Sequence, residues 1–114
     1  MKGLNQELSI IDTFTIQNHF MSTYSASRFS EGNKIFPCVI HIDEKAVTFK
    51  IPGFFNGKET TIPTSRISSV DIETPLIGYS TIIIETTGEG RIRAHGFTKS
   101  EVKEMKKDIL SKIL

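Results

Sequence analysis

Hydrophobic and polar residues alternate along much of the chain after position 37, as they do in β-strands that bury one face. In the clearest case, the segment 46–51, Val47, Phe49 and Ile51 point to one side and the residues between them are polar. Similar patterns, bounded by turn-forming residues, predict further strands at 39–42, 59–63, 67–73, 79–87 and 91–97.

The predicted strand at 67–73 does not keep a strict period of two, because Ile67 and Val70 are three residues apart. One extra residue near Ser68 and Ser69 would return the apolar side chains to a single face. We therefore expect a β-bulge at these two serines.

The last two predicted strands are joined by Gly88-Glu89-Gly90, which predicts a β-hairpin with a three-residue loop. This loop would place Thr87 opposite Arg91 and Glu85 opposite Arg93. A two-residue loop would mix polar and apolar side chains on one face, so consistency of the faces favours the longer loop. The shared apolar face would then consist of Ile82, Ile84, Ile92 and Ala94.

A helix is predicted to follow the last strand. Thr98 is a suitable N-cap, and Glu101 stands three residues later, where its side chain can reach back to the N-cap amide. Apolar residues then recur at helical spacing and predict a core-facing side. These residues are Val102, Met105, Ile109 and Ile113.

The first part of the chain is predicted to comprise an N-terminal extension, residues 1–19, and the start of the domain, residues 20–114. A strand is expected from Phe20 to Phe29, with alternate side chains on one side. The extension is more apolar than an ordinary tail, so it is expected to pack either on its own domain or on a neighbouring subunit. Its large apolar residues are Leu4, Leu8, Ile10, Ile11, Phe14 and Ile16.

The amino-acid composition limits the kinds of protein that this chain can be. The chain has 114 residues, of which 38% are hydrophobic and 24% charged, with a formal net charge of +1. This composition is that of one folded domain, and the small charge argues against a nucleic-acid binder that relies on bulk charge. Cys38 is the single cysteine, which excludes an internal disulfide. The longest aliphatic run, Ile82-Ile83-Ile84, is too short to span a membrane, and the start has no apolar signal core, so we expect a cytoplasmic protein.

Several stretches of the sequence resemble the bacterial pleckstrin-homology-like family. The similarity covers about residues 37–112, and its motifs are apolar spacings, Ile-Pro and Gly-Tyr, which specify a fold and no chemistry. The resemblance implies a barrel of about seven antiparallel strands in two near-orthogonal sheets, capped by a C-terminal α-helix. The stretches that carry it are Ile40–Lys50, Gly53-Phe54-Phe55, Lys58–Pro63, Arg66–Val70 and Gly78–Gly88.

The resemblance also bears on lipid binding. Many relatives carry transmembrane helices beside this domain, and this sequence has none, so membrane tethering is not carried over. Lipid-binding pleckstrin-homology domains line the first hairpin with several Lys and Arg residues. Here the expected first hairpin offers Arg28 and Lys34 with Glu31 between them, so no tight lipid binding is expected.

Residues that could support catalysis or metal binding are few. His41 and Asp43 are two apart and share a strand face, but two ligands fall short of the three or four that a metal site needs. Cys38 has no neighbouring base and is expected to be a small buried hydrophobe. Gly88-Glu89-Gly90 joins two strands and opens no helix, so it is no phosphate loop. We expect no enzyme activity, no metal and no cofactor.

Three surface features are candidate binding sites. Arg91, Arg93 and His95 share one strand face and could contact an anion, although Glu85 would partly neutralise them. Two adjacent aromatic residues cannot both point inward from a simple turn. One of Phe54 and Phe55 is therefore expected to cover the barrel mouth, and the other to be exposed to a partner. The third candidate is the apolar extension, represented by Leu4, Leu8 and Ile11.

These observations favour a non-enzymatic binding module that acts through protein–protein contacts, including self-association. The partner would be another protein or a second copy of the chain, and no nucleic acid is expected. The alternative is peripheral binding of an anionic membrane surface or lipid headgroup through Arg91, Arg93, His95 and the lysines of the last helix.

Overall fold

The computed structural model describes residues 21–113, and residues 1–20 and 114 lie outside that description. The predicted helical spacing of Leu4, Leu8 and Ile11 therefore falls outside the described residues. Within them the chain forms seven β-strands, one short 3-10 helix and one α-helix. In chain order these are β1 (Ser22–Ser25), β2 (Val39–Ile42), β3 (Ala46–Ile51), β4 (Lys58–Pro63), η1 (Thr64–Arg66), β5 (Ile67–Glu73), β6 (Ser80–Thr86), β7 (Arg91–Phe97) and α2 (Lys99–Ile113).

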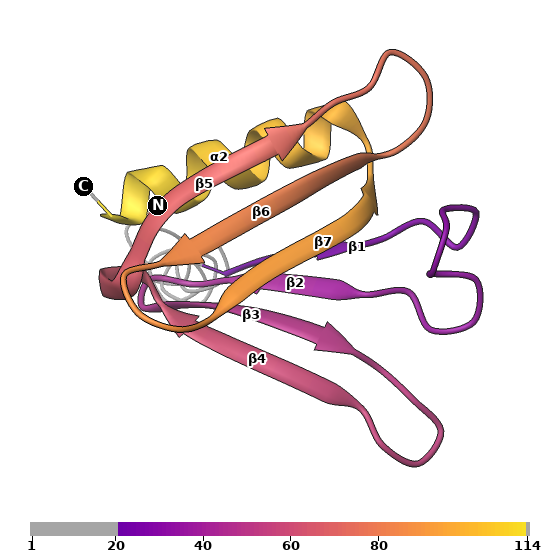
Figure 1. The fold of residues 1–114 in the computed structure, drawn as a ribbon, viewed down its shortest axis with the longest axis horizontal. Helices are drawn as coiled ribbons and strands as arrows, with labels where there is room; N and C mark the ends of the chain where they lie inside the picture. Colours follow the sequence, from indigo (N-terminus) through magenta and orange to yellow (C-terminus); the bar gives the residue numbers. More distant parts are fainter. Residues whose placement is uncertain (1–20, 114) are drawn as a thin grey trace, which may run out of the picture.

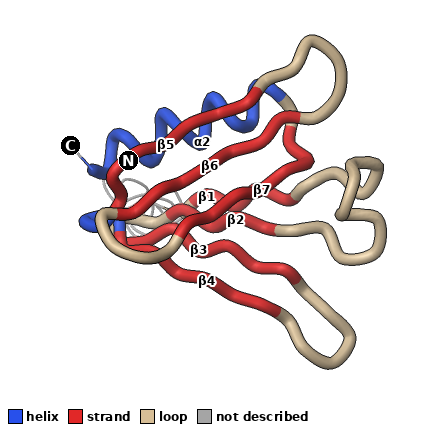
Figure 2. The backbone as a smooth tube through the Cα atoms, viewed as in Figure 1, coloured by secondary structure: helices blue, strands red, loops and turns tan. Residues whose placement is uncertain are grey.

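The strands form two antiparallel sheets that are stacked around one core (Figures 1 and 2). The first sheet has the order β1-β2-β3-β4, and the second has the order β5-β6-β7. Helix α2 contacts β5, β6, β2 and η1, so its apolar face covers the open side between the sheets. The seven predicted strands and the C-terminal helix are confirmed.

The predicted barrel is not closed. Strand pairing stops at β4 in one sheet and resumes at β5 in the other, with η1 turning the corner between them. At the other junction, the backbone N–H of Ser27 donates to the carbonyl oxygen of Gly96 at 2.8 Å. The alternation of side chains determines which face of a strand is buried, but it does not determine whether two sheet edges meet.

The first strand is shorter than predicted. It spans Ser22–Ser25 instead of Phe20–Phe29, because the chain turns at Ser27, whose carbonyl oxygen accepts a hydrogen bond from the N–H of Ser30 at 3.1 Å. Ala26 is buried just beyond the strand, whereas Arg28 is exposed.

The hairpin of β6 and β7 has the predicted faces but a different register. Glu85 lies opposite Arg91, and Ile83 lies opposite Arg93, so the predicted pairing of Glu85 with Arg93 is wrong by two residues. A shift of two keeps every side chain on its own face, and for this reason face consistency could not detect the error. The observed loop between Glu85 and Arg91 is longer than the predicted loop of three residues. It is stabilised by the hydroxyl of Thr86, which donates to the carbonyl oxygens of Gly88 and Gly90.

The predicted bulge is confirmed. The pairing of β5 with β6 shifts between Ile67 and Ser69. Ile67 and Val70 are both buried as a result, although three positions separate them. The bulge therefore lets an irregular sequence present one apolar face to the core.

Helix α2 begins with the predicted capping box. The backbone N–H of Glu101 donates to the Thr98 hydroxyl at 3.1 Å, and the N–H of Thr98 donates to the Glu101 carboxylate at 2.9 Å. Ile113 departs from the prediction, because 38% of it is exposed at the end of the helix. Helical spacing gives the direction of a side chain but not how far the sheets extend beneath it. The fully buried apolar residues of the helix are Val102, Met105 and Ile109.

The core joins both sheets and the helix in one cluster of apolar side chains. Ile40, Ile42 and Val47 enter it from the first sheet and are completely buried. The second sheet contributes the predicted hairpin face. That face consists of Ile82, Ile84, Ile92 and Ala94, all at most 1% exposed. Within the described part of the chain, no helix is long and apolar enough to cross a bilayer.

Met105 should be one of the main contributors to stability. It is completely buried between the sheets, so Met105→Ala should lower the free energy of unfolding by about 2–5 kcal/mol. Met21 is 56% exposed and provides a matched control, for which Met21→Ala should change stability by no more than about 0.5 kcal/mol. Urea denaturation measures both, and similar losses in the two variants would contradict the capping role of α2.

Candidate functional site

Six large apolar side chains are exposed in three loops at one end of the molecule. We call this group the apolar loop end. Its exposure ranges from 66% for Ile35 to 98% for Phe55. The β1–β2, β3–β4 and β5–β6 loops all extend from the right-hand end of the molecule in this view and are fanned out from one another (Figures 1 and 2). The members are Phe29 and Ile35 in the first loop, Phe54 and Phe55 in the second, and Leu76 and Ile77 in the third.

The β3–β4 hairpin carries the most prominent of these side chains. All residues of this hairpin from Ile51 to Glu59 are exposed, so its tip extends beyond the core. Phe54 packs edge-on against Phe36, with ring centroids 4.8 Å apart and planes at 85°. Phe54 nevertheless remains 82% exposed and Phe55 98%. The prediction that one phenylalanine covers the barrel mouth is therefore wrong, because the pair lies outside the space between the sheets.

A hollow of about 350 Å³ separates the β1–β2 loop from the base of the β3–β4 hairpin. We call it the loop hollow, and its lining is mainly apolar. A smaller hollow of about 160 Å³ shares Gly32, Phe36 and Ile51 with it and reaches Arg93 and His95 of β7. The residues that line the loop hollow are Gly32, Lys34, Ile35, Phe36, Ile51 and Pro52.

The β1–β2 loop is held in place by Asn33, whose side chain is buried. The amide nitrogen of Asn33 donates to the carbonyl oxygen of His95 and to the Ser30 hydroxyl, both at 2.8 Å. Its amide oxygen accepts the backbone N–H of Cys38 at 2.9 Å. This side chain therefore fixes the loop that presents Phe29 and Ile35.

Gly96 makes room for this anchor. Its φ is +117°, a backbone conformation that residues with a Cβ atom rarely adopt. A Cβ atom at this position would lie 2.4 Å from the Ser30 hydroxyl oxygen and 2.7 Å from the Asn33 amide nitrogen. Glycine is therefore required for the loop to pack against β7.

The three predicted anion contacts lie together on the outer face of the second sheet, but each already has a partner. Arg91 pairs with Glu85 at 3.2 Å, as its register position requires. Arg93 pairs with Glu73 of β5 at 3.0 Å. The hydroxyl of Thr81 lies 2.8 Å from His95 Nδ1. Two of the three positive or ionisable groups thus face a carboxylate, which weakens this face as an anion site.

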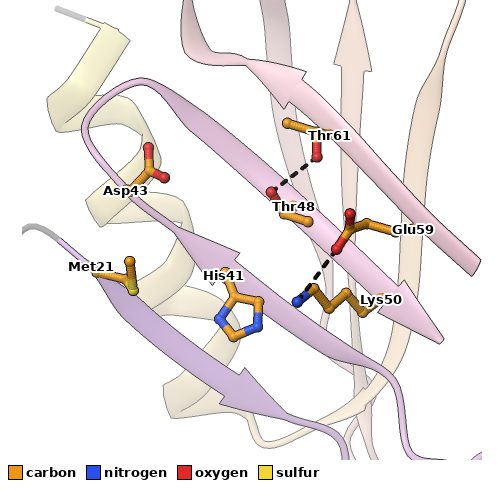
Figure 3. Close-up of a pocket in the computed structure, with 7 residues that line it drawn as sticks. All are labelled: Met21, His41, Asp43, Thr48, Lys50, Glu59 and Thr61. Carbon is orange, nitrogen blue, oxygen red and sulfur yellow. Dashed lines mark hydrogen bonds and ion pairs between the residues drawn. The ribbon is translucent and has the colours of Figure 1, made fainter. Parts of the chain in front are cut away.

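A shallow polar hollow of about 290 Å³ lies on the outer face of the first sheet (Figure 3). His41 and Asp43 both line it, as the shared strand face predicted. Asp43, however, accepts the backbone N–H groups of Lys45 and Ala46 at 2.8 Å each and so closes the β2–β3 turn. Among residues 21–113, no three His, Cys, Asp or Glu side chains are grouped as a metal site would need. The lining residues are Met21, His41, Asp43, Thr48, Lys50, Glu59 and Thr61.

Comparison with known families decides the identity of the fold. A sequence profile of the bacterial PH domain matches residues 34–113. The chain belongs to the bacterial PH domain family. No curated protein matches the chain. The matched region of this bacterial PH domain includes the whole β3–β4 and β5–β6 loops and every residue that lines the loop hollow except Gly32.

Cys38 in this bacterial PH domain is a packing residue, as predicted. It is buried, and its thiol donates to the carbonyl oxygen of His95 at 3.7 Å. Burial raises the pKa of the Cys38 thiol above its usual value. The thiol therefore stays protonated near neutral pH, a state that is poorly suited to nucleophilic attack.

Sequence reasoning identified only part of the apolar loop end. It named Phe54 and Phe55, but it missed Phe29, Ile35, Leu76 and Ile77. A signal was available for the β5–β6 loop, where two large aliphatic residues follow Pro75 inside a segment that carries no strand pattern. The third predicted contact, made by Leu4, Leu8 and Ile11, lies outside the described residues.

Asn33 should be far more important for stability than other loop asparagines. Replacement of Asn33 by alanine removes four hydrogen bonds and leaves the buried Cys38 N–H without this acceptor, at a cost of about 1–3 kcal/mol. Asn56→Ala is the matched control, because Asn56 is exposed at the β3–β4 tip. Chemical denaturation should show a loss only for Asn33→Ala. Equal stability of the two variants would contradict the anchoring role.

Proposed function

We propose that this bacterial PH domain is a non-enzymatic binding module that acts through protein–protein contacts, and that its binding surface is the apolar loop end. The observation that carries the proposal is the position of the six exposed apolar side chains. They occur on three loops that are far apart in sequence but project from the same end. Clusters of exposed apolar residues on a folded domain are typical of interaction sites.

The energetics support contact with another macromolecule. Phe54, Phe55, Leu76 and Ile77 contribute almost nothing to the core, since each is at least 82% exposed. Burial of a large apolar side chain contributes roughly 1.5–3 kcal/mol, before the cost of ordering. A partner that covers several of these residues would therefore gain enough for a specific complex.

The residues with catalytic potential support a binding role over an enzymatic one. His41 lies 2.8 Å from the Thr23 hydroxyl, and Asp43 closes a turn. Cys38 is buried with a raised pKa. His41 and Asp43 line one shallow hollow, but each has a structural partner, and Cys38 does not line that hollow. Catalysis requires an acid, base or nucleophile that is free to act within reach of one substrate.

A membrane surface is the second candidate partner. Arg28 and Lys34 lie in the β1–β2 loop beside Phe29 and Ile35, so positive charge accompanies two of the apolar side chains. Glu31 in the same loop opposes them. The remaining excess charge is small, which favours a protein partner over an anionic bilayer.

The main proposal predicts protein contacts at position 55. Phe55 replaced by photoreactive benzoylphenylalanine should form covalent adducts with a protein in cells. The same replacement at Ser65, an exposed residue of η1 between the two sheets, is the control and should form none. Adducts of equal yield at both positions, or none at position 55, would overturn the proposal.

Because a protein is preferred over an anionic membrane as the partner, we expect weak binding to lipid vesicles. At physiological salt, the protein should barely co-sediment with vesicles of phosphatidylcholine and phosphatidylglycerol. Arg91→Ala together with Arg93→Ala should leave this result unchanged, because both arginines already pair with carboxylates. Strong co-sedimentation of the parent that is lost in Phe55→Ser would instead make a membrane surface the preferred partner.

A further inference from the structure

We infer that the partner of the apolar loop end is the same end of a second copy of this chain, with Phe55 of each copy seated in the loop hollow of the other. This inference rests on the proposed function, since it names the occupant of the same surface. It follows from four features of the loop end: a protruding side chain, an apolar hollow, low net charge and sufficient area.

Phe55 is the protruding side chain. It is 98% exposed at the tip of the β3–β4 hairpin. Its neighbour Phe54 already packs against Phe36 within the same chain. Phe55 thus makes almost no contact with its own chain and is available to a neighbour.

The loop hollow provides a place for such a side chain. It is an open hollow of about 350 Å³, wide enough for a phenyl ring to rest against Ile35, Phe36, Ile51 and Pro52. An apolar hollow next to an exposed phenylalanine makes the surface self-complementary. A two-fold axis would then place two such contacts in one interface, and the assembly would close as a dimer.

The charges of this end do not oppose the approach of a second copy. Lys50 of β3 pairs with Glu59 of β4 at 3.3 Å below the hairpin loop, and Arg93 pairs with Glu73 below the β5–β6 loop. The β1–β2 loop carries charges of both signs, and the net charge of the whole chain is only +1. Two identical copies therefore experience little long-range repulsion.

The exposed area is sufficient for a stable dimer. One aromatic side chain buries roughly 150–250 Å². Phe29, Phe54 and Phe55 are 82–98% exposed, so together they offer roughly 400–700 Å² per copy. Ile35, Leu76 and Ile77 bring the apolar area close to the roughly 800 Å² per partner of a standard interface. The three loops extend from the same end of the molecule and are spread apart there (Figure 1), so an opposing surface must span that whole end to contact all of them, as a second copy of the same end can.

The first experiment measures the oligomeric state of the full chain by sedimentation velocity from micromolar to millimolar concentration. The parent should approach twice the monomer mass as the concentration rises. Phe55→Asp and Ile35→Lys should each stay monomeric over the same range. Met21→Asp, which alters an exposed apolar residue just before β1, at the end of that strand opposite the β1–β2 loop, is the control and should dimerise like the parent.

A mixing experiment tests the geometry of the contact. The Phe55→Asp copy keeps an intact hollow, and the Ile35→Lys copy keeps Phe55. An equimolar mixture should therefore restore dimerisation, since one contact is intact and the other brings a new carboxylate to a new ammonium group. Thermal melts of each variant alone establish that it is folded.

Three outcomes would overturn the inference. A parent that stays monomeric at all concentrations excludes self-association, whereas adducts of another protein at position 55 would leave the proposed function standing. If the dimer persists in both variants but dissociates when residues 1–16 are deleted, the interface lies in the N-terminal extension. Failure of the mixture to dimerise would exclude the seating of Phe55 in the loop hollow.

Discussion

The side chain of Asn33 connects the two sheets at a point where strand pairing does not. Its amide nitrogen binds the carbonyl oxygen of His95 in the second sheet, and its amide oxygen binds the N–H of Cys38, which leads into the first sheet. Gly96 allows this contact because a Cβ atom would displace it. The path of the β1–β2 loop, and hence the shape of the loop hollow, depends on this one buried amide.

The molecule separates stability from binding. The core and helix α2 hold the two sheets together, and their apolar residues are almost fully buried. The apolar loop end lies beyond that core, and its side chains are exposed because the loops extend past the ends of the strands. Loop residues can therefore change with little effect on stability, while the anchor at Asn33 keeps the first loop in one position.

The polar faces of the sheets serve the fold more than they form a site. Arg91, Arg93 and Asp43 were candidates because of their residue types, yet each has a partner that explains its position. The partner of Arg93 is Glu73 on β5, and not Glu85 as the sequence indicated, because the true register of β6 and β7 differs from the predicted one by two residues. Pairing of charges across strands depends on that register, which alternation alone leaves open.

The sequence by itself determined the local elements: the strand at 46–51, the bulge near Ser69 and the capping box of Thr98 and Glu101 all follow from neighbours in the chain. It did not determine that Ile51, at the end of that strand, is exposed. The sequence also singled out Phe54 and Phe55 as a candidate contact, although it wrongly placed one of them over the barrel mouth. Tertiary structure alone decided that the sheets remain unclosed, that Ile113 is exposed and that three loops extend from the same end. The physical reason is that periodicity specifies the direction of a side chain relative to its own strand or helix, whereas edge closure, register and the grouping of loops depend on contacts between residues far apart in sequence.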